Sequence, residues 1–291
     1  MKKSHRLLSL LLSLPVFLVS CGKGNVEDTK TIYTTFYQIY DITKAIVGEK
    51  YEVKCLTPYG QEPHDYEPTA KEIAEMTSAS SIFLNGLGLD QWSDSLPESI
   101  KKKCYTLTKG IETKRINGIE DPHVWLSVKN TMKELLTIKD IVTNLDSENQ
   151  EYYEDNYSRE LNRLKELDEK YQSQLNDIKN KYLVVSHAAF GYLANDYGLT
   201  QIYIAGLEPD ATPTAKKMEE LIEKVKKYHV STIFYEETIS PDIAKKIAEE
   251  ANVKTETLHT LESIEKEDEG KVDYISLMED NLSKITKAGN A

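Results

Sequence analysis

The hydrophobic pattern of the first half alternates short β-branched or aromatic runs with amphipathic helical stretches. A helical pattern at Ile39–Val47 lies between the first two runs, which is the order of a βαβ unit. The expected strands are Thr31–Phe36, Tyr51–Leu56, Ser81–Asn85 and Cys104–Leu107. This alternation predicts a parallel sheet covered by helices, in an α/β lobe that ends near Leu145.

The second half of the chain repeats this plan. Its expected strands are Tyr182–Ser186, Gln201–Ile204, Thr232–Tyr235 and Val253–Leu258. A last helix is expected from about Val272 to Lys287. Thr69-Ala-Lys-Glu72 has the pattern of a capping box, and Pro213 and Pro241 are expected at first helical positions. The sequence therefore predicts two α/β lobes.

The segment 147–181 between the two halves contains neither Gly nor Pro and carries an apolar stripe at helical spacing. About 32 helical residues make a rod of roughly 48 Å, long enough to run along both lobes. We expect an N-terminal lobe at 31–146, a linking helix at 147–181 and a C-terminal lobe at 182–291. A rigid link of this kind should permit only small rocking between the lobes.

The N-terminus has the pattern of a secretory signal. Lys2, Lys3 and Arg6 precede an apolar run at Leu7–Val19 that is too short to span a bilayer. The run ends in Leu-Val-Ser-Cys21-Gly, which resembles a bacterial lipobox. We expect a signal peptide at 1–20, a lipidated Cys21, a polar tether at 21–30 and an extracytoplasmic, membrane-anchored protein. The alternative is an ordinary signal peptide with an incidental cysteine.

Charge and cysteine content narrow the possible partners. The chain has a formal net charge of −12, and the expected signal peptide removes only basic charges, which argues against nucleic acid as a partner. Cys55 and Cys104 remain after export, and an exported pair of cysteines suggests a disulfide. They lie in different expected strands, however, so their redox state stays open.

Three histidines occupy similar places in the expected topology. His64 follows the second expected strand, His123 precedes a helix that Ser127 could cap, and His187 ends the strand that begins at Tyr182. Ligands of open parallel sheets bind beyond the carboxyl ends of the strands, where all three are expected. His229 lies at the opposite edge and is expected to be a surface residue. A lone loop histidine is usually structural, but three at this edge indicate a transition-metal site.

A metal site needs a fourth ligand and residues that orient its ligands. His259 and Glu262 both follow the last strand, and either could supply a fourth ligand. Glu236 and Glu237 end another strand at the same edge, so one of them could orient a ligand histidine through its second ring nitrogen. We expect Trp125 and Phe190 to pack between the lobes.

Three motifs resemble the zinc/manganese solute-binding lipoproteins of bacterial ABC transporters, which include metal-binding adhesin-like lipoproteins. They are Pro-His64-Asp-Tyr-Glu-Pro, Asp-Pro-His123-Val-Trp-Leu-Ser and Val-Ser-His187-Ala-Ala-Phe-Gly-Tyr. The resemblance covers the whole chain after the signal peptide. It implies two lobes on a helical spine, a metal site in the cleft between them, and the ligands His64, His123, His187 and Glu262. It also implies a monomeric, non-catalytic protein that delivers a metal ion to a membrane permease.

The donor set favours zinc, with manganese as second choice. Three imidazoles and one carboxylate suit zinc better than manganese, and manganese-selective members of the family tend to carry a carboxylate in place of His187. The His-rich loop of many zinc-specific members is absent between His64 and His123. We expect two ligands from each lobe, so that slight separation of the lobes would release the ion.

Two alternatives belong to other functional classes. A secreted zinc hydrolase would use the three histidines as ligands and Glu262 as general base, with a water in the open position. A surface adhesin would retain the metal for its structure. The chain contains no His-Glu-x-x-His pattern, and a fourth protein donor would close a catalytic site.

Overall fold

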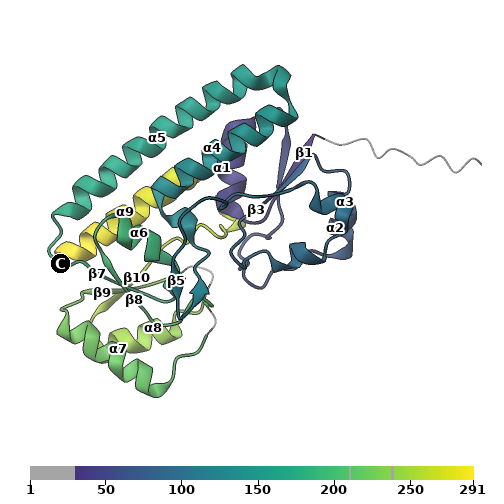
Figure 1. The fold of residues 1–291 in the computed structure, drawn as a ribbon. Coiled ribbons are helices and arrows are strands. Elements are labelled where there is room, and N and C mark those ends of the chain that lie inside the picture. Colours follow the sequence, from purple (N-terminus) through teal and green to yellow (C-terminus); the bar gives the residue numbers. More distant parts are fainter. Residues whose placement is uncertain (1–29, 210, 237–238) are drawn as a thin grey trace, which may run out of the picture.

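The structure is a computed structural model that describes residues 30–291 except 210, 237 and 238. The expected signal peptide 1–20, Cys21, Glu237 and all of the tether but Lys30 therefore lie outside the described residues. Two α/β lobes are connected by long helices, with α5 running as a rod along α4 and α9 (Figure 1). Within the described residues, no helix is long and apolar enough to cross a membrane.

The first lobe is built on a four-stranded parallel sheet with the order β2-β1-β3-β4. Its strands are β1 (Thr31–Thr34), β2 (Glu52–Cys55), β3 (Ser81–Leu84) and β4 (Cys104–Thr106). Its helices are α1 (Tyr37–Val47), α2 (Ala70–Met76), α3 (Glu98–Lys101) and the 3₁₀ helix η1 (Gln91–Ser95). Every residue of β1 and β3 is buried, as expected for central parallel strands covered on both faces.

The second lobe repeats this sheet with the order β10-β9-β7-β8, again all parallel. Its strands are β7 (Tyr182–Val185), β8 (Thr200–Tyr203), β9 (Thr232–Tyr235) and β10 (Lys254–Thr257). Its helices are α6 (Gly191–Asp196), α7 (Ala215–Lys227), α8 (Asp242–Ala251) and α9 (Tyr274–Asn290), with η4 (Ala188–Phe190) and η5 (Lys266–Asp268). The eight strands predicted from the sequence are confirmed, each to within a few residues.

The remaining elements lie between the two sheets in the sequence. They are the antiparallel hairpin β5 (Arg115–Ile116) and β6 (Ile119–Glu120), η2 (Val124–Leu126), α4 (Val128–Leu145), η3 (Ser147–Asn149) and α5 (Gln150–Asn176). The sequence analysis did not predict the hairpin. Ser127 does cap α4, because its hydroxyl accepts a hydrogen bond from the Asn130 amide at 3.1 Å.

The linking helix is shorter than predicted. Helix α5 has 27 residues, or about 40 Å, instead of the expected segment 147–181. At its start, residues Ser147–Asn149 form the separate 3₁₀ helix η3. At its end, the Lys181 ammonium donates to the carbonyls of Leu175 and Asn176, the latter at 2.7 Å. Lys181 thus caps the helix from outside, because a cation satisfies its terminal carbonyls.

Two of the three predicted helix starts also shift. Thr69 and Glu72 form the capping box as predicted. Helix α7 begins at Ala215, because the Thr214 hydroxyl caps it by accepting from the Lys217 amide at 3.3 Å, so Pro213 lies before the helix. Pro241 is the N-cap of α8 and not its first residue. Helix α7 therefore begins where Thr214 caps it and not at Pro213.

The two lobes share one apolar core. The largest cluster of buried apolar side chains includes Phe36 and Trp125 from the first half of the chain and Phe190 and Tyr274 from the second. Trp125 and Phe190 thus pack between the lobes as predicted. Separating the lobes would expose this core, which agrees with the expectation of small movements only.

Cys55 and Cys104 are both free thiols. They lie in β2 and β4, the two edge strands of the first sheet, with β1 and β3 between them. Three strand spacings amount to roughly 14 Å, well beyond the distance that a disulfide can bridge. Strand order, which the sequence left open, therefore keeps these cysteines apart.

Candidate metal centre

Four side chains from distant parts of the sequence converge between the lobes. His64, His123, His187 and Glu262 each offer one ligand atom, and these atoms lie within 4.8 Å of one another. His64 is in the loop between β2 and α2, His123 precedes η2, His187 follows β7, and Glu262 follows β10. The structure thus brings together all four residues predicted as ligands.

The spacing of the donor atoms fits a single tetrahedral ion. The His123 Nε2 atom lies 3.2 Å from that of His64 and 3.1 Å from that of His187. Glu262 Oε1 lies 3.2 Å from His64 Nε2 and 3.4 Å from His123 Nε2. Ligands at about 2.0–2.1 Å from a tetrahedral zinc ion are about 3.3 Å apart. Four of the six donor pairs have this spacing, and all six lie within 4.8 Å, so the donors surround a point where one ion could be held.

The cluster is closed to solvent on nearly every side. The side chains of His123, His187 and Glu262 are 0% exposed, and that of His64 is 6% exposed. The Trp125 ring lies against His123 at a centroid distance of 5.2 Å and against Phe36 at 4.5 Å. This apolar wall excludes water, which strengthens electrostatic interactions inside the site.

Buried carboxylates orient two of the histidines. Asp121 Oδ1 accepts hydrogen bonds from the backbone amide of His123 at 3.0 Å and from its Nδ1 atom at 2.8 Å. Glu236 Oε1 accepts from His187 Nδ1 and from the Ser186 hydroxyl. A proton held on Nδ1 leaves Nε2 free to coordinate, so these carboxylates fix the ring orientation and tautomer that a metal requires.

The role considered for Glu236 thus matches its contact with His187, whereas Asp121 received no role from the sequence. Its position two residues before His123 was the available signal, because Asp commonly accepts a hydrogen bond from the backbone amide two residues on. That contact places the carboxylate where it also reaches the ring.

The electrostatics of the metal-free cluster centre on His123 and Glu262. Burial would lower the pKa of His123, but hydrogen bonds to Asp121 and Glu262 outweigh burial and raise the pKa to about 9. Burial would raise the pKa of Glu262, but hydrogen bonds from His123 and His64 hold it well below its usual range. Without a metal, the cluster therefore retains a proton that an incoming cation must displace.

The loop that carries Glu262 is attached to the first lobe. The first two backbone amides of α1, those of Tyr37 and Gln38, donate to the carbonyls of Glu262 at 3.2 Å and Leu261 at 3.1 Å. The Trp125 indole donates to the carbonyl of Thr260 at 2.7 Å. The helix start is thus satisfied by carbonyls more than 200 positions away. We call Thr260–Glu262 and these three bonds the interlobe clasp.

Backbone strain accompanies the clasp. Leu261 is buried and has a φ of 60°, a left-handed conformation that is unfavourable for a branched side chain. A residue held in this region costs on the order of 1–3 kcal/mol and persists where its surroundings require it. Here the turn directs two carbonyls at α1 and the Glu262 carboxylate at the histidines.

The other two described histidines lie outside the cluster. His259 Nε2 lies 2.9 Å from Asp280 Oδ2 on α9, and the His259 backbone amide donates to Asn281. His229 is exposed just after the end of α7, as predicted. Of the two candidates for a fourth donor, only Glu262 faces the histidines.

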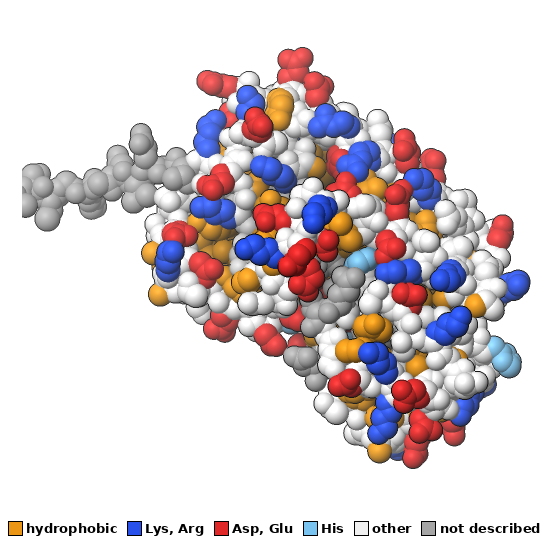
Figure 2. All heavy atoms as spheres, turned by 180° about the vertical axis from the view of Figure 1, so that it is seen from behind, with side chains coloured by type: hydrophobic (Ala, Val, Ile, Leu, Met, Phe, Trp, Pro, Cys, Tyr) orange, Lys and Arg blue, Asp and Glu red, His pale blue; other side chains and the backbone are white. Residues whose placement is uncertain are grey.

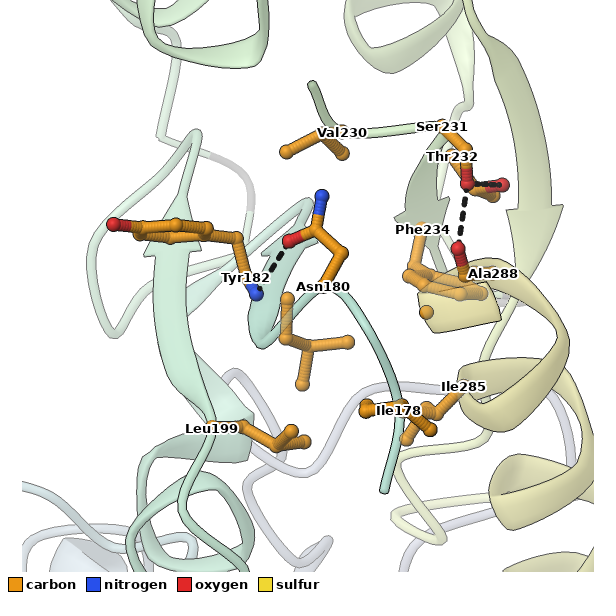
Figure 3. A pocket seen from close by; sticks show the side chains of 12 residues that line it. Ile178, Asn180, Tyr182, Leu199, Val230, Ser231, Thr232, Phe234, Ile285 and Ala288 are labelled. Carbon is orange, nitrogen blue, oxygen red and sulfur yellow. Dashed lines mark hydrogen bonds between the residues drawn. The ribbon is translucent and has the colours of Figure 1, made fainter. Parts of the chain in front are cut away.

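A small cavity at the opposite edge of the second sheet is not a solute site. Figure 3 shows its lining side chains, with Asn180 accepting from the Tyr182 amide at 3.0 Å and Ser231 donating to the Ala288 carbonyl at 2.8 Å. Its volume of about 10 Å³ holds about one water molecule.

Curated relatives of this chain are named as zinc-binding or zinc-uptake proteins. The zinc-binding lipoprotein AdcA of Streptococcus pneumoniae is 37% identical over 98% of this chain, which spans 60% of the length of that relative. The high-affinity zinc uptake system protein ZnuA of Bacillus subtilis is 35% identical over 93% of both chains.

Solved structures show the same fold. The Zn(II)-bound ZnuA-like domain of Streptococcus pneumoniae AdcA is 37% identical, with a TM-score of 0.80 over 90% of this chain and all of that domain. The laminin-binding protein Lmb of Streptococcus agalactiae, described as having adhesin and metal transporting activity, is 27% identical, with a TM-score of 0.84 over 89% of this chain and 99% of that one. A family model matches residues 32–288, and this chain belongs to that family, ZnuA, the periplasmic zinc-uptake complex component A.

Proposed function

We propose that this protein is the extracytoplasmic, zinc-binding component of an ABC uptake transporter, with His64, His123, His187 and Glu262 as the zinc ligands. The observation that carries the proposal is the convergence of three imidazole nitrogens and one carboxylate oxygen within 4.8 Å, with four of the six donor pairs at the spacing of a tetrahedral zinc site. Two of the histidines already present Nε2 because carboxylates hold their Nδ1 protons. The names of the relatives support the same metal and the same transport role.

Zinc is the favoured cargo and manganese the second choice. A four-coordinate site with three imidazoles matches the softness and geometry of zinc, whereas manganese prefers six ligands that are mostly oxygen. The Glu262 carboxylate, whose pKa is lowered by its hydrogen bonds to the two histidines, supplies one compensating charge. The ion therefore enters a buried site that already has a carboxylate to balance it.

The interlobe clasp changes the expected mechanism of release. Glu262 belongs to the second half of the chain, but its loop is hydrogen-bonded to α1 and Trp125. In a rocking movement, His64, His123 and Glu262 would stay together, while His187 would move with β7 and Glu236. We propose that docking on the permease withdraws His187 from the other three ligands, in place of the even division expected from the sequence.

The remaining features of the proposal concern the ends and the division of the chain. A signal peptide at 1–20 and a tether at 21–30, with lipidated Cys21, would hold the protein at the extracytoplasmic face of a membrane. The functional division is a lobe at 31–146, a linking segment at 147–181 and a lobe at 182–291. We propose that the protein acts as a monomer and binds the permease of the transporter.

The hydrolase alternative is disfavoured by the position of Glu262. A catalytic zinc keeps an open position for water, whereas here a fourth buried donor lies within coordinating reach of the same point. An adhesin function, as described for the Streptococcus agalactiae protein, would be additional to metal transport and is not part of this proposal.

The proposal is tested by the metal content of the chain purified without chelators. Elemental analysis and native mass spectrometry should find one zinc per chain, and chelation should remove it. A thousandfold excess of zinc over Kd should then stabilise the metal-free protein by about 4 kcal/mol. His187→Ala should lose the bound zinc, while the control His229→Ala should keep it. Equal melting curves with and without zinc would refute the proposal.

A further inference from the structure

A second group of potential ligands adjoins the proposed zinc centre. One carboxylate oxygen each from Glu62, Glu236 and Glu262 lies within 4.8 Å of the others. Glu62 precedes His64 by two residues in the loop between β2 and α2, and it is half-buried, whereas Glu236 and Glu262 are buried. The group therefore extends from the inner cluster towards the solvent-facing side of that loop.

The two buried carboxylates have an unused oxygen each. Glu236 directs Oε1 at His187 and Ser186, and Glu262 directs Oε1 at His64 and His123. In both residues Oε2 is buried and has no hydrogen-bond partner among the described residues. A buried carboxylate oxygen without a partner is costly, because desolvation is not compensated. These two oxygens are the kind of group that a cation would satisfy.

The charge of this region also favours a second bound cation. Asp121, Glu62, Glu236 and Glu262 place four carboxylates around three imidazoles, which are neutral when they coordinate zinc. One bound divalent cation would therefore balance only half of the carboxylate charge when all four are ionised. On the face shown in Figure 2, acidic side chains lie together with basic ones around the middle of the molecule. Uncompensated like charges are expensive in a buried site, and a second divalent cation would relieve them.

We propose that Glu62, Glu236 and Glu262 form an outer, all-oxygen subsite for a second divalent cation, next to the zinc centre and sharing Glu262 with it. This inference rests on the proposed function, because Glu262 would bridge the two ions. Carboxylates commonly bridge metal pairs about 3.5–4 Å apart. The oxygen donors select a hard cation of the magnesium, calcium or manganese class, and three donors make the outer subsite weaker than the inner one.

The test uses manganese as the probe, because its paramagnetic resonance signal in water is lost on binding. The chain is first loaded with one equivalent of zinc, and zinc content is measured before and after manganese is added. The wild type should bind one manganese per chain while retaining its zinc. Glu62→Gln should weaken manganese binding at least tenfold and leave one zinc in the inner site. Glu67→Gln removes the same charge from an exposed position of the same loop and should behave as the wild type.

The outcomes separate the two proposals. A chain that loads no zinc overturns the proposed function and the outer subsite with it. A zinc-loaded wild type that binds no manganese, or binds it only by losing zinc, overturns the outer subsite alone. Manganese binding by Glu62→Gln that equals the wild type does the same, because the cation would then be held elsewhere.

Discussion

The two lobes have the same strand order but supply the metal centre from different strands. Read from the second strand of each lobe, the orders β2-β1-β3-β4 and β8-β7-β9-β10 are identical. In the first lobe, His64 follows the edge strand β2, and His123 comes after the other edge strand, β4, and the hairpin β5–β6. In the second, His187 follows the central strand β7 and Glu262 follows the edge strand β10. Repetition of a sheet therefore sets which edge carries ligands, whereas the loops decide which strands supply them.

The residues that follow corresponding strands of the two lobes also make corresponding contacts beside the ligand histidines. Asn85 follows β3 and donates to the carbonyl of Pro122, next to His123, at 3.1 Å. Glu236 follows β9, the corresponding strand, and accepts from the ring of His187. The first lobe can use a neutral amide here because the loop of His123 brings its own carboxylate, Asp121. The second lobe has its carboxylate on the neighbouring strand, which explains why Asp121 and Glu236 occupy different topological positions but make the same contact.

The largest expected effect is the loss of zinc affinity at low pH, which depends on the proton held by His123 in the first lobe. Zinc must displace the proton that His123 retains with a pKa of about 9. Protonation favours the metal-free state, so affinity should fall as pH falls. Displacing one proton costs about tenfold in affinity per pH unit below this pKa, so we expect a loss of about 100-fold between about pH 7.5 and about pH 5.5, measured by competition with a chromogenic chelator. A flat curve would mean that the histidines are not ligands.

The next prediction compares how much zinc affinity depends on each of the two candidate donors that follow β10. Glu262→Ala should weaken zinc binding by roughly 10- to 100-fold or more, because it removes a donor and a compensating charge. His259→Ala is the matched control and should change affinity little, since His259 contacts Asp280 and not the cluster. Isothermal titration of both variants decides the assignment. A reversed order would remove Glu262 from the site and make it a four-histidine centre.

The supporting carboxylates test whether the two lobes hold their histidines in the same way. Asp121→Asn and Glu236→Gln keep an oxygen that can accept from Nδ1 but remove its charge. Each should weaken zinc binding by about tenfold, the lower end of the range for residues that orient metal ligands. Direct titration at one pH measures both. A loss in only one variant would show that the lobes differ in how they position their ligand.

The smallest effect concerns the interlobe clasp. Trp125→Phe keeps an aromatic wall beside His123 but removes the hydrogen bond to Thr260, leaving a buried carbonyl unpaired. We expect a loss of about 1–3 kcal/mol in the free energy of unfolding and less than about a tenfold change in zinc affinity. Denaturant unfolding measures the free energy of unfolding. Stopped-flow release of zinc to a chelator measures the change in zinc binding. Trp92→Phe, in η1, is the control and should leave release unchanged.

Much of the fold was predictable, because its signals are local. The eight strands, the capping box and the surface position of His229 follow from runs of five or six residues. The errors were local too: the end of α5 depends on Lys181, and the start of α7 depends on the Thr214 hydroxyl. Periodicity alone does not show which side chain will satisfy a helix terminus, so element boundaries were less certain than elements.

The sequence by itself determined the order of strands and helices, the residue types available to a metal, and the sheet edge to which His64, His123 and His187 belong. The tertiary structure decided the rest. It chose Glu262 over His259, placed Asp121 and Glu236 behind their histidines, brought Glu62 beside them, and bound the Glu262 loop to α1. These contacts join residues far apart in the sequence and depend on how two sheets pack around one core. No local pattern encodes that arrangement, because it follows from burial and hydrogen-bond satisfaction across the whole molecule.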